Sequence, residues 1–100
     1  MKYRLTKSAE KDLVDIWNYT TKEWSEAQAE FYLNQLDARF LLLAENPMLG
    51  RVRKELWEGV YSLGSGQHII FYRYSQGRVE ILRVLHASRD VSIHLPSEEV

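Results

Sequence analysis

The chain has 100 residues, of which 45% are hydrophobic and 27% are charged, with a formal net charge of −1 and no cysteine. This length suits one domain with a single core, and the composition is that of a globular chain. The lack of cysteine excludes disulfides and thiolate metal sites, and no stretch resembles a secretion signal or a membrane span. We therefore expect a cytoplasmic protein.

The charged residues are unevenly distributed along the chain. Residues 1–50 carry six basic and eight acidic side chains, whereas residues 51–90 carry seven basic and four acidic ones. A high-affinity nucleic-acid binder needs clustered Lys and Arg against phosphates, which the low net charge does not favour. We expect the more basic half to face an acidic protein partner, with no direct specific binding of nucleic acid.

The N-terminal half begins with a short predicted strand and a helix. Residues Lys2–Thr6 alternate polar and apolar side chains, as a strand does. From Lys7 the apolar spacing changes to three and four residues, which predicts an amphipathic helix with Thr6 as its N-cap. The inner stripe of this helix comprises Ala9, Leu13, Ile16, Trp17, Thr20 and Trp24.

A second helix is predicted to follow with almost no linker. Ser25 and Gln28 fit a capping box, in which the Ser25 hydroxyl accepts from the Gln28 N–H and the Gln28 side chain reaches back to the Ser25 N–H. The helix ends near Asn46, because Pro47 disfavours helical geometry at the preceding residue. Two long helices joined this closely must lie antiparallel, as a helical hairpin.

The C-terminal half predicts a loop and then an antiparallel meander. The loop covers Met48–Gly59 and has one turn near Lys54–Trp57. β-Branched and aromatic runs, separated by glycine-containing turns, predict strands at Val60–Leu63, Gln67–Tyr74 and Arg78–His86. The N-terminal strand pairs at an edge or beside the last strand. The predicted fold class is α+β with about four strands in one sheet, as a single domain over residues 1–95 followed by a flexible tail over residues 96–100.

The last predicted strand carries apolar side chains on both faces. One face holds Val79, Ile81, Arg83 and Leu85, and the other holds Glu80, Leu82, Val84 and His86. The helical hairpin covers one face; the other either receives a partner or lies beneath the Met48–Gly59 loop and the tail. Trp57 on that loop is accordingly either a lid over the sheet or an interface anchor.

Four stretches along the chain carry a family pattern. They are AEKDLVDIWNYT from Ala9, QAEFYLNQLDARFLLLAENPMLGR from Gln28, HIIFYRY from His68 and ILRVLHASRD from Ile81. Their order and spacing over about residues 2–92 resemble the RelE/ParE superfamily of toxins, and the ParE branch in particular. The resemblance implies a strand, a helical hairpin and an antiparallel sheet, and it implies a ParD-like antitoxin as partner.

The resemblance allows two activities. RelE-like members are similar to ribonucleases that cut mRNA on the ribosome, whereas ParE-like members resemble inhibitors of DNA gyrase that do no chemistry. RNA cleavage needs a general acid, a general base and cations on the phosphorane, which His86 and nearby arginines could supply. RelE-like sites usually carry a Tyr, His or Glu near the C-terminal end, and here no tyrosine follows the last strand. Acidic residues also lie among the basic ones, and the net charge is low for a protein that must bind ribosomal RNA.

We therefore expect a ParE-type toxin that is not an enzyme, binds no cofactor or metal, and acts by binding DNA gyrase. The alternatives are a ribosome-dependent mRNA endonuclease and an inactive homologue that only binds its antitoxin. The target-binding candidates are polar or aromatic residues of the last strand, its exit and the preceding elements, namely Arg73, Arg83, His86, Ser88, Arg89 and Trp57.

Two of these candidates also have purely structural interpretations. Arg83 would pair with Glu80 or Asp90, an exposed pair worth about 0.5 kcal/mol. His86 would be a hydrogen-bonded histidine at a strand end. Trp17 and Trp24, with the aromatic stripe of the second helix, are expected in the core.

Overall fold

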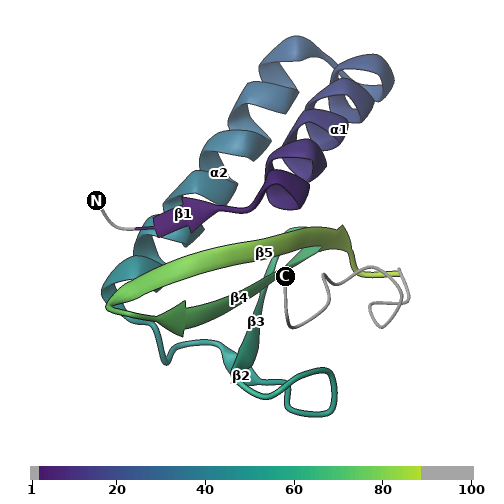
Figure 1. Ribbon diagram of the computed structural model, residues 1–100. Coiled ribbons are helices and arrows are strands. Elements are labelled where there is room, and N and C mark those ends of the chain that lie inside the picture. The colour runs from purple at the N-terminus through teal and green to yellow at the C-terminus, as the bar shows by residue number, and fades with distance from the viewer. Residues whose placement is uncertain (1–2, 89–100) are drawn as a thin grey trace.

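The computed structural model describes residues 3–88 and has two helices packed on one face of a mixed sheet (Figure 1). The elements in chain order are β1 (Tyr3–Leu5), α1 (Lys7–Glu23), α2 (Glu26–Glu45), β2 (Arg51–Val52), β3 (Val60–Ser65), β4 (His68–Ser75) and β5 (Arg78–His86). The predicted α+β class and helical hairpin are confirmed. Neither helix is long and apolar enough to cross a membrane, judged over the described residues.

The first helix begins where the sequence predicts. The Thr6 side chain accepts a hydrogen bond from the Ala9 N–H at 3.0 Å, which satisfies one of the first unpaired donors of α1. The same hydroxyl donates to the Leu82 carbonyl of β5 at 2.8 Å. Thr6 therefore both starts α1 and fixes its first turn against the sheet.

Only half of the predicted capping box forms at the start of α2. The Ser25 hydroxyl accepts from the Gln28 N–H at 3.0 Å, as predicted. The Ser25 N–H, however, donates to the Thr20 carbonyl at 3.2 Å and not to the Gln28 side chain. The tight connection between the helices places that carbonyl within reach, so the last turn of α1 takes over the reciprocal role.

The sheet has five strands in the order β1-β5-β4-β3-β2, one more than the predicted number of about four. β1 lies beside β5 and parallel to it, and the other neighbours are antiparallel. The extra strand is Arg51–Val52, which lies in the predicted loop and pairs with Ser62 and Tyr61. Two residues are too short a run to show the alternation by which a strand is recognised.

The third strand is longer than the sequence indicates. β3 continues through Gly64 and Ser65, which pair with Ile69 and His68, so the predicted turn at Gly64–Gly66 moves to residues 66–67. Gly66 has a φ of 58° and supplies the left-handed conformation of this turn. At the same end of the sheet, His68 of β4 also lies opposite His86 of β5.

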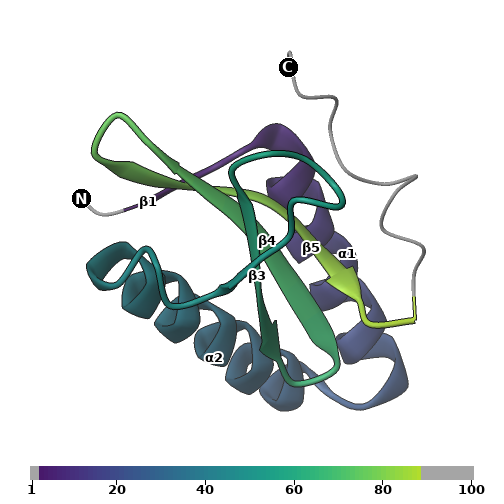
Figure 2. The same ribbon diagram turned by 90° about the horizontal axis from the view of Figure 1, so that it is seen from below.

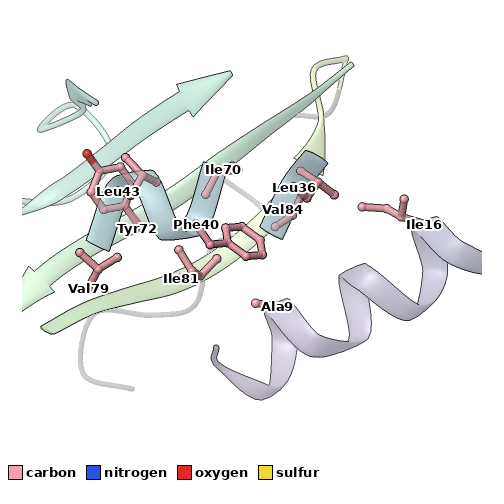
Figure 3. Close-up of a cluster of buried hydrophobic side chains, with 10 residues drawn as sticks. All are labelled: Ala9, Ile16, Leu36, Phe40, Leu43, Ile70, Tyr72, Val79, Ile81 and Val84. Atoms are coloured by element: carbon pink, nitrogen blue, oxygen red, sulfur yellow. The ribbon is translucent and has the colours of Figure 1, made fainter. Parts of the chain in front are cut away.

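The main core lies between the helical hairpin and the inner face of the sheet. Side chains from α1, α2, β4 and β5 point toward one another there (Figure 3). Phe40 and Leu36 of α2 share this core with Tyr72 and Ile70 of β4, and all four are at most 2% exposed. Burial of this apolar surface, at about 25 cal/mol per Å², is the main source of stability in a chain without disulfides.

A second, smaller core lies on the outer face of the sheet. Val60, Phe71, Leu82 and Leu85 form a buried cluster there, against which Leu56, Trp57 and Ile69 pack. Viewed from the sheet side, the connection between β2 and β3 lies in front of β4 and β5 (Figure 2). The loop thus covers part of this face, as one of the two sequence-based alternatives predicted; the predicted tail lies outside the described residues.

Candidate functional site

A β-bulge in β5 decides which side chains reach the predicted site. Phe71 lies opposite Arg83 and Tyr72 opposite Ile81, so Leu82 is an extra residue in β5. The predicted alternation of faces holds through Leu82 and is wrong beyond it, because the bulge shifts the later side chains by one position. As a result Val84 packs in the main core, whereas Leu82 and Leu85 pack in the outer cluster.

Arg83 is bound by a carboxylate from the first helix. Its Nε and one terminal nitrogen donate to the two oxygens of Asp12 at 2.7 and 2.8 Å, and the side chains are 17% and 9% exposed. The hydrogen bond to Asp12 raises the pKa of Arg83, and burial of the guanidinium opposes that shift. The predicted pairing with Glu80 is wrong, since Glu80 pairs with Arg73; Asp90 lies outside the described residues.

His86 and Ser88 form a local hydrogen-bonded pair at the exit of β5. Nδ1 of His86 accepts from the Ser88 N–H at 3.2 Å and lies 2.8 Å from the Ser88 hydroxyl. Because a backbone N–H can only donate, Nδ1 carries a lone pair and the ring proton lies on Nε2 in this arrangement. Both residues are exposed, so their polar edges are available to a partner.

A groove of about 810 Å³ lies beside this pair, between the helical hairpin and the end of β4 and β5. The hairpin diverges from the sheet toward the connection between α1 and α2, which leaves room for the groove (Figure 1). Its walls include Tyr19 and Trp24 of α1, His68 of β4, and His86 with Ser88. The His68 and His86 rings meet edge to face with centroids 5.5 Å apart.

Two exposed aromatic side chains lie at the rim of the groove, and one of them, Trp24, contradicts a prediction. Trp24 was expected in the core, but it is 75% exposed, and Tyr19 is 65% exposed. Trp24 is the C-cap of α1, and the connection between α1 and α2 lies at the end of the hairpin farthest from the sheet (Figure 1). Helical spacing cannot reveal that no sheet lies beneath the last turn, so sequence reasoning missed this pair of exposed rings.

Tyr32 of α2 lines the groove and connects α2 to the turn between β3 and β4. Its hydroxyl lies 2.6 Å from Nδ1 of His68, accepts from the Gln67 N–H at 3.1 Å and lies 3.2 Å from the Ser65 carbonyl. Burial raises the pKa of Tyr32, and the Gln67 N–H opposes this shift. Tyr32 was predicted as a core residue, and its spacing gave no sign of a contact with residues more than thirty positions away.

The remaining candidates lie elsewhere. Arg73 lies near the opposite end of the sheet, where its Nε is 3.4 Å from Glu80. Trp57 packs on the outer cluster of the sheet and is therefore a lid in this structure. Arg89 lies outside the described residues. The structure thus brings His86 and Ser88 together, places Arg83 in an ion pair beside them, and separates Arg73 and Trp57 from them.

The side chains that line the groove offer hydrogen bonds, aromatic contacts and the carboxylates of Asp12 and Asp15. Between residues 3 and 88, the imidazole of His86 hydrogen-bonds only to Ser88, and the charge of Arg83 is offset by Asp12. Within the same range, no group of three or more His, Cys, Asp or Glu side chains could hold a metal ion. The described residues therefore present a surface suited to recognising another molecule.

Comparison with known proteins gives a consistent result. Residues 3–91 match the family model described as the ParE toxin of the type II toxin–antitoxin system parDE. The chain is 42% identical to Toxin ParE1 of Caulobacter vibrioides over 93 residues, covering 93% of this chain and 96% of that protein. It is 37% identical to Toxin ParE1 of Mycobacterium tuberculosis over 95 residues, covering 94% and 97%.

Two solved structures share the fold. One is from the chromosomal ParDE system of P. aeruginosa, with a TM-score of 0.74 at 19% identity, covering 86% of this chain and 95% of that one. The other is from the RelBE2 toxin–antitoxin complex of M. tuberculosis, with a TM-score of 0.57 at 25% identity, covering 85% and 96%. By the family match and the identity to the ParE1 proteins over nearly the whole chain, this protein belongs to the ParE toxin family of type II toxin–antitoxin systems.

Proposed function

We propose that this ParE-family toxin arrests growth in the cytoplasm by binding DNA gyrase, without making or breaking a covalent bond, and that a ParD-like antitoxin neutralises it. The observation that carries the non-enzymatic part is the ion pair between Arg83 and Asp12. A phosphate-cleaving site needs cations that are ready to stabilise developing negative charge. The arginine nearest to His86 in β5 instead binds a carboxylate of its own chain.

The proposed target surface is the groove and its rim. His86 and Ser88 offer polar edges there, and Tyr19 and Trp24 offer exposed rings. Aromatic anchors surrounded by polar groups are typical of the centres of protein interfaces. Arg89 follows Ser88 directly in the sequence and belongs to the same proposal.

The test is induction of the toxin in cells with two parallel readouts. We expect gyrase-dependent DNA breaks and an SOS response, without codon-specific cuts in mRNA. Purified protein should inhibit supercoiling by gyrase, and co-expression of the antitoxin from the adjacent reading frame should restore growth. Cleavage of mRNA in translating ribosomes with unchanged supercoiling would instead favour the RelE-like activity, and antitoxin binding without growth arrest would favour an inactive homologue.

A further inference from the structure

Three arginines surround one glutamate on the outer face of the sheet. Arg4 of β1 lies beside Glu80 of β5, and Arg73 of β4 lies on the other side of Glu80, so the three form a row across three strands. Arg78 precedes Glu80 by two residues and therefore shares its face. The opposite side of these strands packs against the helices through Tyr3, Leu5, Val79 and Ile81. We call Arg4, Arg73 and Arg78 the arginine row.

Two members of the row, Arg4 and Arg78, have no carboxylate partner within residues 3–88. Glu80 is 3.4 Å from Nε of Arg73, a long contact, and the two side chains are 25% and 30% exposed. Arg4 and Arg78 are exposed, and within residues 3–88 neither forms an ion pair or a side-chain hydrogen bond. Exposed guanidinium groups held on a rigid sheet are preorganised donors for carboxylates or phosphates.

The surroundings favour carboxylates on a polypeptide over a nucleic acid. Binding of single-stranded nucleic acid relies on exposed rings on which bases stack. On this face Phe71 is fully buried, and Trp57 packs against the outer cluster. The net charge of −1 also gives little attraction for a phosphate backbone.

We propose that the arginine row binds an acidic segment of the antitoxin. This inference rests on the proposed function, because it assumes that an antitoxin is the partner. Carboxylates of a segment lying along this face would form charge-assisted hydrogen bonds with Arg4 and Arg78 and would offset the charge of these two side chains. The row lies away from the groove that carries His86 and Ser88, so antitoxin and target would depend on different residues.

The experiment measures the affinity of the full chain for its antitoxin by biolayer interferometry at several salt concentrations. The double variant Arg4→Glu/Arg78→Glu should bind at least about tenfold more weakly at low salt, and the difference should shrink as salt rises. The matched control is Arg39→Glu, which reverses an exposed charge on α2 and should leave the affinity unchanged. The milder double variant Arg4→Gln/Arg78→Gln serves if the reversal next to Glu80 prevents folding, and circular dichroism melting checks both.

The inference is overturned if both double variants bind the antitoxin as tightly as the parent chain and the Arg39 control do. If the parent chain itself fails to bind the antitoxin, the proposed function fails instead, so the two failures are distinguishable.

A further arm uses a chain ending at Leu95, which lacks Glu98 and Glu99. If the double variant no longer weakens antitoxin binding in the shortened chain, the row binds the protein's own acidic residues, and the inference is overturned. Binding of a single-stranded oligonucleotide that requires the row, with unchanged antitoxin affinity, would do the same.

Discussion

The carboxylate of Asp12 and the guanidinium of Arg83, 71 residues apart, form a two-pronged ion pair between α1 and β5. The same carboxylate accepts the Val84 N–H at 2.9 Å. β1 pairs with β5 only as far as Ile81, so beyond that point the helix takes the place of a neighbouring strand. One acidic side chain therefore closes part of the exposed edge of the sheet.

Replacing Asp12 should destabilise the fold. Asp12→Ala removes the carboxylate that accepts from the largely buried Arg83 guanidinium and from the Val84 N–H. We expect the free energy of unfolding in urea to fall by about 2–4 kcal/mol. The control is Asp15→Ala, which breaks the exposed pair with Lys11 and should cost less than about 0.5 kcal/mol. Similar losses in both variants would show that the Asp12 contacts contribute little.

This ion pair also affects how the target surface can be mapped. Arg83→Glu would place two carboxylates against each other in a largely buried site, and it should therefore unfold the chain or destabilise it strongly. Loss of growth arrest in that variant would report on folding and not on the target. Mapping of the target surface should therefore begin with exposed residues such as His86 and Ser88.

Local sequence patterns predicted most of the fold. The start of α1 at Lys7, the capping role of Ser25 and the bounds of β5 are as expected, because each depends on residues a few positions apart. The strand Arg51–Val52 was missed because its pairing partner is the only sign of it. The bulge at Leu82 was missed because β5 has apolar side chains on both faces, so only its pairing with β4 reveals the extra residue.

The candidate site was predicted less well, since its contacts join distant segments. Arg83 was expected to pair within its own strand or just beyond it, whereas its partner lies in α1. Trp24 fits the apolar spacing of α1, but the divergence of the helical hairpin from the sheet leaves it exposed. His86 and Ser88 were grouped correctly because the contact between them spans only two residues.

Trp57 should contribute to stability as a lid over the outer cluster. Trp57→Ala would uncover part of the outer cluster, and we expect a loss of about 2–3 kcal/mol in the free energy of unfolding, with increased binding of a hydrophobic dye. Trp24→Ala is the matched control, because Trp24 is 75% exposed and its removal should cost less than about 1 kcal/mol. A Trp57 variant of unchanged stability that loses only partner binding would make Trp57 an interface anchor.

The hydroxyl of Tyr72 should fix the chain that follows α2. It donates to the Pro47 carbonyl at 2.9 Å and accepts from the Gly50 N–H at 2.8 Å. Tyr72→Phe leaves both backbone groups without this partner, and we expect a loss of about 1–3 kcal/mol in urea unfolding.

Gly50→Ala should disturb the same contact sterically. An added Cβ would lie 2.5 Å from the Tyr72 hydroxyl and 2.7 Å from the Ser62 carbonyl, so the chain must shift. The control is Gly64→Ala, because a Cβ there meets nothing within 4 Å, and it should be neutral or slightly stabilising. Equal stability of the two alanine variants would contradict the close approach at Gly50.

Stability should fall at alkaline pH because of Tyr3. Burial, together with its hydrogen bond to Asp37, raises the pKa of Tyr3 from 10.0 to about 12. The unfolded chain therefore releases the phenol proton at lower pH than the folded chain, and the free energy of unfolding should decrease as pH rises from 10.0 to about 12. Burial shifts the pKa values of Tyr32 and Tyr72 in the same direction.

Tyr3→Phe should make this alkaline decrease shallower, as measured by urea unfolding at a series of pH values. Asp37→Asn removes the charged acceptor, so ultraviolet titration of the phenolate should show Tyr3 ionising at lower pH than in the parent chain. The decrease would have another origin if Tyr3→Phe left its slope unchanged.

His86 and Ser88 should be needed for target binding but not for folding. Both side chains are exposed, and their mutual hydrogen bonds are local, so His86→Ala and Ser88→Ala should leave the melting temperature within about 2 °C of the parent value. If the groove binds gyrase, His86→Ala removes the imidazole that would hydrogen-bond to gyrase and that packs against His68. Inhibition of supercoiling should therefore weaken about tenfold. Ser75→Ala, an exposed change at the far hairpin, is the control and should inhibit like the parent chain. Full inhibition by His86→Ala and Ser88→Ala, with gyrase still the target, would place the inhibitory surface elsewhere on the molecule.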